Sequence, residues 1–118
     1  MLEVVEIKGP ALLLQARGRI NSRTALAFET AAKRAFAGTD QDVIIDASQV
    51  TYLSTAGLRA FLRLWQQLRK ENRSLHVCSL KPHIQHVFKI IGFDRFIPIE
   101  ADSVAALAAV EDRTQGKS

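Results

Sequence analysis

The sequence predicts a single α/β domain in which a mixed, mostly parallel sheet is covered by helices. Strand-like and helix-like patterns alternate in the order β-β-α-β-α-β-α-β-α, and strands joined by crossover helices run parallel. The 118 residues match the usual size of one domain, and 47% of them are hydrophobic, which is enough for a core. We assign residues 1–112 to this domain and residues 113–118 to a polar C-terminal tail.

Two strands are predicted at the start of the chain. Residues 2–7 alternate weakly between apolar and acidic side chains, which indicates an edge strand. Gly9 and Pro10 signal a turn, and the apolar run 11–16 predicts a more buried strand that ends at residues 17–19. Because the two segments are so close in sequence, we expect them to form a hairpin.

The first helix is predicted from apolar residues that recur at helical spacing between Ala25 and Ala35. Asn21 or Ser22 is a suitable N-cap for it, and Gly38 is a suitable end. The β-branched run 42–46 then predicts a central strand, and residues 47–52 are expected to form a loop.

A long amphipathic helix is predicted next. Its core-facing residues are expected to be Leu58, Phe61, Leu62, Trp65 and Leu68. Four further elements complete the chain. They are a strand over 75–80, a helix that begins at Pro82 and ends at Gly92, a strand over 96–99, and a helix capped by Ser103. The apolar stripe of the Pro82 helix is expected to be Ile84, Val87, Phe88 and Ile91.

Charge and hydropathy exclude several classes of protein. Sixteen Lys and Arg against twelve Asp and Glu give a net charge of +4, but the basic residues are dispersed, so we expect no direct binding to nucleic acid. No run approaches the ~18 apolar residues of a membrane span, and acids occupy the N-terminal segment where a signal peptide has bases. We therefore expect a cytoplasmic protein with no membrane insertion.

Catalytic and metal-binding patterns are absent from the sequence. It contains no phosphate-binding glycine loop and no hydrolase nucleophile motif. His83 and His86 stand three apart without a further ligand, and Cys78 in an apolar strand is expected to be a small core residue. We therefore expect neither an enzyme nor a metal or cofactor site.

Ser54 and Thr55 stand out because they begin the long helix. Small hydroxyl residues at this position are firstly caps for the free N–H groups. A hydroxyl there is also well placed as a phosphate acceptor, because the N–H groups and the helix dipole favour negative charge.

The segment from Asp46 to Arg59 (D-x-S-x-V-x-x-L-S-T-A-G-L-R) resembles the signature of the STAS domain, a family that includes bacterial anti-sigma factor antagonists. The segments 18–25 and 82–93 resemble the stretches before the first helix and along the third helix of that family. The similarity covers roughly residues 3–110. It implies a fold with about four helices packed on one face of a mixed sheet.

The resemblance also implies a mechanism. The unphosphorylated protein binds an anti-sigma factor that is itself a serine/threonine kinase, and this binding releases the sigma factor. The kinase then phosphorylates the antagonist and ends binding, and a protein phosphatase reverses the modification. The family's acceptor lies two residues before the motif glycine, which is Thr55 in this sequence, with Ser54 as the alternative.

The partner-binding residues that the resemblance implies lie near this acceptor. They are Asn21, Ser22, Ser54, Thr55, Ala56 and Arg59, with Arg63 one turn further along the helix. Switch proteins of the family often carry Asp where this chain has Ser54 and Asn21, so its surface is less negative there. Related domains also serve as cytoplasmic regulatory subunits of membrane transporters, including lipid-transport ATPases, and this is the alternative function.

Overall fold

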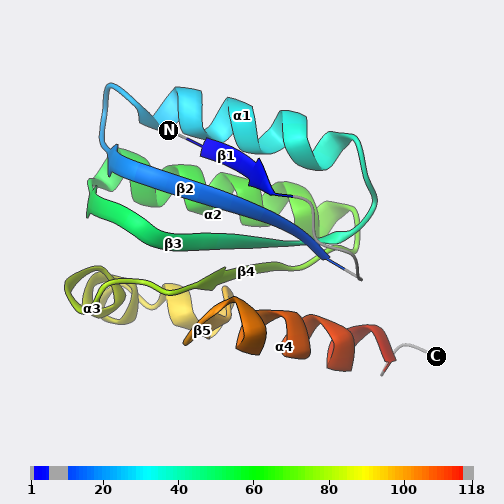
Figure 1. Cartoon of the computed structure of the whole chain (residues 1–118). Helices are drawn as coiled ribbons and strands as arrows, with labels where there is room; N and C mark the ends of the chain where they lie inside the picture. Colours follow the sequence, from blue (N-terminus) through cyan, green and yellow to red (C-terminus); the bar gives the residue numbers. More distant parts are fainter. Residues whose placement is uncertain (1, 6–10, 116–118) are drawn as a thin grey trace.

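The computed structural model describes residues 2–5 and 11–115 of the chain, and these form strands and helices in the predicted alternation (Figure 1). The elements are β1 (Leu2–Val5), β2 (Ala11–Ile20), α1 (Ala25–Ala37), β3 (Asp42–Leu53), α2 (Thr55–Lys70), β4 (Leu75–Cys78), α3 (Pro82–Ile90), the short 3-10 helix η1 (Phe93–Arg95), β5 (Ile99–Glu100) and α4 (Ser103–Gln115).

The described strands form one mixed sheet in the order β1-β2-β3-β4-β5. β1 is antiparallel to β2, and β3, β4 and β5 each pair in parallel with the preceding strand. The mostly parallel sheet and its N-terminal hairpin are therefore confirmed. The turn predicted at Gly9 and Pro10 lies outside the described residues.

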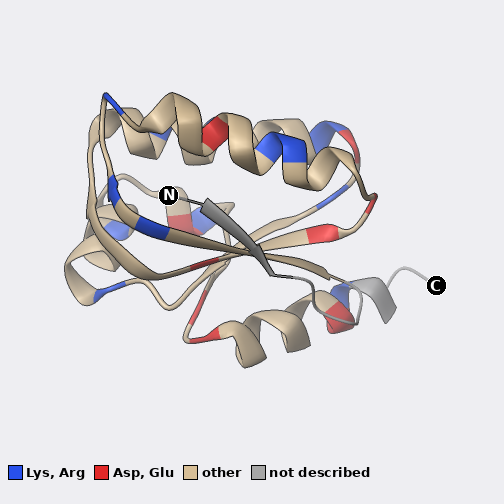
Figure 2. Ribbon diagram, turned by 45° about the horizontal axis from the view of Figure 1, so that its top comes forward, with Lys and Arg blue, Asp and Glu red and all other residues tan. Residues whose placement is uncertain are grey.

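The helices cover both faces of the sheet. α1, α2 and α3 pack on the face that carries Leu14, Ile45 and Val77, whereas α4 lies on the opposite face, against Leu13 and Ile44 (Figure 2). The expectation of four helices on one face is therefore wrong for α4. The reason is that successive residues of β3 are apolar and fully buried on both sides, so each face of the central strand needs a cover.

β2 and β3 are longer than predicted. β2 does not end at residues 17–19 as expected but continues to Ile20. Its register with β3 is irregular near Gly18, which has a φ of 79°, a value that glycine adopts readily. Residues 47–52 are not a loop, because β3 runs to Leu53 with Ala47 and Val50 buried between more exposed neighbours. This half-exposed pattern is that of a strand with one solvated face.

The apolar faces of α2 and α3 differ in detail from the prediction. In α2 the buried residues include Ala60, Phe61, Leu64 and Leu68, whereas Leu58, Leu62 and Trp65 are only half-buried. In α3, Ile84 and Phe88 are buried, but Val87 and the following Ile91 are exposed. The Phe61 ring lies 5.0 Å from the Phe28 ring and 5.6 Å from the Phe88 ring, centroid to centroid, and joins the three helices.

The C-terminal elements also begin and end at other residues than predicted. β4 stops at Cys78, where Ser79 takes a φ of 62°, and the strand predicted over 96–99 begins only at Ile99 because η1 precedes it. Asp102 rather than Ser103 caps α4, since its Oδ1 accepts from the N–H of Ala105 at 2.8 Å.

α4 extends into the segment assigned to the tail. Its last described residue is Gln115. Arg113 is anchored there, because its guanidinium donates to the buried carboxylate of Asp42 at 2.7 Å and to the carbonyl of Asn72 at 3.1 Å. Residues 116–118 of the predicted tail lie outside the described part of the chain.

Candidate functional site

The predicted site lies where β2 and β3 end side by side. Ile20 pairs in register with Leu53, and the N–H of Ser54 donates to the carbonyl of Ile20 at 2.9 Å. The turn that begins at Asn21 and the start of α2 therefore leave the sheet at the same edge (Figure 1). The structure thus brings together the two segments that the sequence analysis placed in one site.

Ser54 is the N-cap of α2. Its backbone is extended, with φ −86° and ψ 175°, and its Oγ accepts from the N–H of Gly57 at 3.3 Å. Its carbonyl accepts the first helical hydrogen bond, from the N–H of Leu58 at 2.9 Å. The capping role considered for this hydroxyl is confirmed.

Thr55 is the first residue of α2, and it is exposed. Within the described part of the chain, no group forms a hydrogen bond with its hydroxyl. The first turn of α2 carries no acidic side chain, so the positive end of the helix dipole is not compensated there. The position combines an accessible hydroxyl with a local environment that favours negative charge.

Asn21 closes the turn between β2 and α1 instead of capping the helix. Its Oδ1 accepts from the N–H of Arg23 at 2.9 Å, and its own N–H donates to Thr24 Oγ1 at 2.9 Å. Thr24 occupies the N-cap position of α1, so neither Asn21 nor Ser22 is the cap. Ser22 is exposed at the tip of the turn. The turn is held by its own side chains and presents a preformed surface.

Gly57 has a role that the sequence analysis missed. A Cβ at this position would lie 2.6 Å from Leu53 Cδ1 and 2.7 Å from the carbonyl oxygen of Ile20. Real Cβ atoms do not approach other atoms so closely, so only glycine lets α2 start directly against the ends of β2 and β3. A glycine in the first turn of a strong helical pattern is the signal that indicates such a close approach.

The remaining candidate residues extend the surface along α2. Ala56 is half-buried against the core, and Arg59 is exposed one turn after Thr55. Arg63, one turn further along, is tied to α1, because its Nε donates to the buried carboxylate of Glu29 at 2.7 Å.

Basic and aromatic groups from neighbouring strands widen the site beyond the predicted residues. The Arg19 guanidinium stacks 4.3 Å from the centroid of the Tyr52 ring, and Tyr52 is 41% exposed. His83 Nε2 lies 3.4 Å from the carbonyl oxygen of Thr51, which brings the start of α3 to the same end. The basic residues of β2 and of the turn after it are Arg17, Arg19 and Arg23, and these parts of the chain are blue in Figure 2. The neighbourhood is basic and suits an acidic partner surface.

The described residues contain no cluster of three or more metal-ligating side chains, and none of their helices is long and apolar enough to cross a membrane. Cys78 is fully buried, and burial raises the pKa of its thiol to about 11. A thiol of this kind is protonated at neutral pH and does not act as a nucleophile.

Comparisons with known proteins agree with this geometry. The STAS domain family model matches residues 2–106. BtrV of Bordetella bronchiseptica, named as a candidate anti-sigma factor antagonist, is 36% identical over 93 residues, which are 79% of this chain and 80% of that protein. A structure of a candidate anti-sigma factor antagonist from Thermotoga maritima superposes with a TM-score of 0.85, at 14% identity over 93% of this chain and 94% of the other. An anti-sigma factor antagonist from Mycobacterium paratuberculosis superposes with a TM-score of 0.81, at 25% identity over 94% and 95%.

Proposed function

The chain belongs to the STAS domain family, and we propose that it is an anti-sigma factor antagonist whose binding is switched by phosphorylation of Thr55. In the unphosphorylated form it binds an anti-sigma factor kinase in the cytoplasm and so releases the sigma factor. Phosphorylation ends this binding, and a phosphatase restores it. The observation that carries the proposal is the exposed Thr55 hydroxyl at the first residue of α2, beside the Asn21 turn.

The contacts of the two adjacent hydroxyls favour Thr55 over Ser54 as the acceptor. The Ser54 Oγ is half-buried and accepts a hydrogen bond from the N–H of Gly57. A kinase would have to break this cap before it could transfer phosphate to Ser54. The Thr55 hydroxyl requires no such rearrangement.

A phosphate on Thr55 would leave the fold intact. It adds about −1.5 to −2 charges, next to the free N–H groups and the positive dipole end of α2. Arg59, one turn further along the exposed side, can approach the phosphate as residues four apart do on a helix. The electric charges at the start of α2 are therefore at least as well compensated after phosphorylation as before it.

A partner seated on this surface would lose affinity on phosphorylation. It would have to bury a doubly charged group that was hydrated before binding, and such desolvation costs several kcal/mol when the partner surface is acidic and supplies no cation of its own. The switch thus acts on the interface and not on the fold. In this proposal the interface includes the candidate contacts Asn21, Ser22, Ala56 and Arg59 as well as the acceptor.

Binding to the anti-sigma factor kinase from the same organism tests the proposal. Thr55→Asp introduces a charge at the acceptor, and we expect it to weaken binding by about 100-fold or more, whereas Thr55→Ala retains the wild-type affinity. Ala108→Asp is the control, because it adds the same charge to an exposed position on the opposite face of the sheet. Equal affinities of wild type and Thr55→Asp would contradict the proposal, as would binding of the wild-type protein to a transporter ATPase subunit and to no anti-sigma factor.

A further inference from the structure

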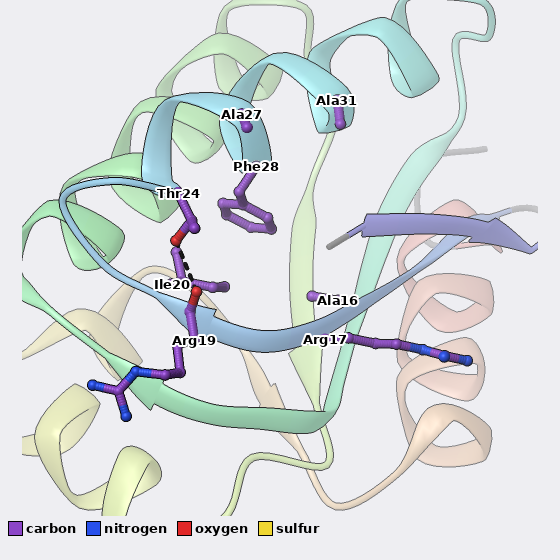
Figure 3. A pocket seen from close by; sticks show the side chains of 8 residues that line it. All are labelled: Ala16, Arg17, Arg19, Ile20, Thr24, Ala27, Phe28 and Ala31. Carbon is purple, nitrogen blue, oxygen red and sulfur yellow. Dashed lines mark hydrogen bonds between the residues drawn. The ribbon is translucent and has the colours of Figure 1, made fainter.

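We propose that the pocket between α1 and β2 binds a small, uncharged, apolar molecule (Figure 3). The pocket has a volume of about 340 Å³. Its floor consists of the buried side chains of Ala16, Ile20 and Phe28, and its rim of Thr24, Ala27 and Ala31. The proposal concerns a site separate from the Thr55 surface and does not depend on the function proposed for that surface.

The space exists because short side chains face one another across the helix and the strand. Ala27 and Ala31 stand one turn apart on α1, and Ala16 faces them from β2. The described pairing of β1 with β2 covers Leu13 to Ala16, so Ala16 is the last residue of this pairing and the rest of the pocket's lining from β2, as far as Ile20, lies beyond it. A helix with larger residues at these positions would fill the space with its own side chains.

The chemistry of the walls favours a ligand without charge. Figure 3 shows that the side chains of Arg17 and Arg19 extend away from the pocket. The Arg19 guanidinium stacks on the Tyr52 ring instead. The Thr24 hydroxyl already donates to the carbonyl of Arg19 at 2.7 Å and accepts from the N–H of Asn21 at 2.9 Å. A charged ligand would therefore give up its hydration without gaining a partner.

The volume defines the size of the ligand. An apolar cavity of about 150 Å³ is sufficient to hold benzene. The pocket is larger than this and lies near the lower end of the range of about 300–1,000 Å³ for small-molecule sites. It therefore suits an alkyl chain of medium length or one substituted aromatic ring.

The walls of the pocket connect with the Asn21 turn and with the start of α2. The hydroxyl of Thr24, a rim residue, accepts a hydrogen bond from the N–H of Asn21. The carbonyl of Ile20, a floor residue, accepts one from the N–H of Ser54 at 2.9 Å. A molecule in the pocket contacts Thr24 and Ile20, the two residues that accept these hydrogen bonds. The amide signals of Asn21 and Ser54 therefore provide a second reporter of binding, independent of the pocket lining.

Nuclear magnetic resonance of the full chain with 13C-labelled alanine methyl groups tests the proposal. On titration with 1-octanol, we expect saturable shifts of the methyl signals of Ala16, Ala27 and Ala31 and of the amide signals of Asn21 and Ser54. Octanoate has nearly the same chain and a negative charge, and it should bind at least about tenfold more weakly. Equal affinity for the two compounds would overturn the assignment of an uncharged ligand.

Variants that fill the pocket provide the control. Ala31→Leu and Ala27→Leu place side-chain atoms in the space, and each should weaken 1-octanol binding at least about tenfold. Ala37→Leu makes the same change at an exposed position of α1 outside the pocket and should bind as the wild type does. Absence of saturable shifts in the wild type, or undiminished binding in the folded pocket-filling variants, would overturn the proposal.

Discussion

Ser54 and Thr55 are neighbouring hydroxyl residues with different surroundings. The Ser54 Oγ is bonded to the N–H of Gly57 and stabilises the helix start, whereas the Thr55 hydroxyl is exposed. The sequence pattern predicted that hydroxyls begin this helix, because Ser and Thr are favoured at helix starts. Which of the two is engaged depends on the backbone angles at the end of β3, and these became visible only in the structure.

The cap can be tested by Ser54→Ala. Loss of the hydrogen bond to Gly57 should lower the free energy of unfolding by about 0.5–2 kcal/mol, as measured by urea denaturation. Ser54→Asp supplies another side-chain acceptor and should retain most of this stability. Equal unfolding midpoints for the wild type and Ser54→Ala would show that the cap contributes nothing.

Gly57 can be tested against a second glycine. In Gly57→Ala, the new Cβ would meet Leu53 and the carbonyl of Ile20 at less than 3 Å, so we expect a loss of about 1–3 kcal/mol in the free energy of unfolding. Gly38→Ala is the matched control, because its Cβ would meet only the carbonyl oxygen of Ala35 at 3.8 Å. If both variants unfold at the same urea concentration, the close approach at Gly57 is not a constraint.

The sequence could not predict two other residue-scale features. The sequence predicts Asn21 or Ser22 as the helix cap, but the turn continues to Thr24, and the Asn21 side chain forms its hydrogen bond within the turn. The glycine in the first turn of α2 signals a close approach, but the local pattern does not identify Leu53 and Ile20 as the neighbours that the approach brings together. Asx turns and N-caps use the same residue types, so composition alone does not separate them.

α2 is the element that connects the site with the core. Its N-terminus carries Ser54 and Thr55, and its buried face places Phe61, Leu64 and Leu68 among the side chains from the sheet and from α1. A partner that binds the helix start therefore meets a rigid element. The salt bridge from Arg63 to Glu29 joins α2 to α1 on the outer side. The hydrogen bonds from Lys33 and Arg63 outweigh the opposing effect of burial and hold the pKa of Glu29 below its usual value.

Paired substitutions in α2 test the orientation of the helix. Leu64 is fully buried, so Leu64→Ala should lower the free energy of unfolding by about 2–5 kcal/mol. Leu62 is half-buried, and Leu62→Ala should have a clearly smaller effect in the same urea titration. A larger loss from Leu62→Ala would mean that the face predicted from the sequence is the buried one.

The sequence predicted whether each element is a strand or a helix, but it predicted the first and last residues of the elements less well. The helical spacing in α2 was clear, but leucines flank the true buried face, and the pattern alone did not show the helix rotation. The loop predicted over 47–52 is the second half of β3, in which the polar residues Gln49 and Thr51 are exposed. Such limits follow from tertiary packing, which decides how far a strand or a buried face continues.

At the scale of the whole molecule, the sheet separates two packed layers. The larger layer contains α1, α2 and α3, and the smaller one is the contact of α4 with β2, β3 and β4. Alternation of strands and helices predicted the class of fold and the parallel strands. It could not predict the side on which α4 lies, because β4 and β5 are too short to show which of their faces is covered.

His76 makes the stability of the molecule dependent on pH. The ring is 4% exposed on β4, with Nδ1 3.5 Å from Glu100 Oε1. Burial lowers its pKa below the usual 6.5, with Arg113 acting in the same direction and Glu100 and Asp42 opposing. Below pH 6.5 the unfolded chain therefore takes up a proton before the folded one does. The free energy of unfolding should decrease as the pH falls, by at most about 1.4 kcal/mol per pH unit.

His76→Gln removes this titration. Urea denaturation between pH 7.5 and 5.5 should show a shallower decrease for this variant than for the wild type. Ile90→Gln is the control, because it places glutamine at an exposed position and removes no titratable group. Parallel pH profiles of wild type and His76→Gln would rule out His76 as the source.

Mapping of the phosphorylated residue tests the central claim most directly. The protein, Ser54→Ala and Thr55→Ala are each incubated with the anti-sigma factor kinase and ATP, and the modified peptide is identified by mass spectrometry. The account predicts phosphate on Thr55 in the wild type and in Ser54→Ala, and none in Thr55→Ala. Phosphate on Ser54 alone, or no phosphate on any of the three proteins, would contradict it.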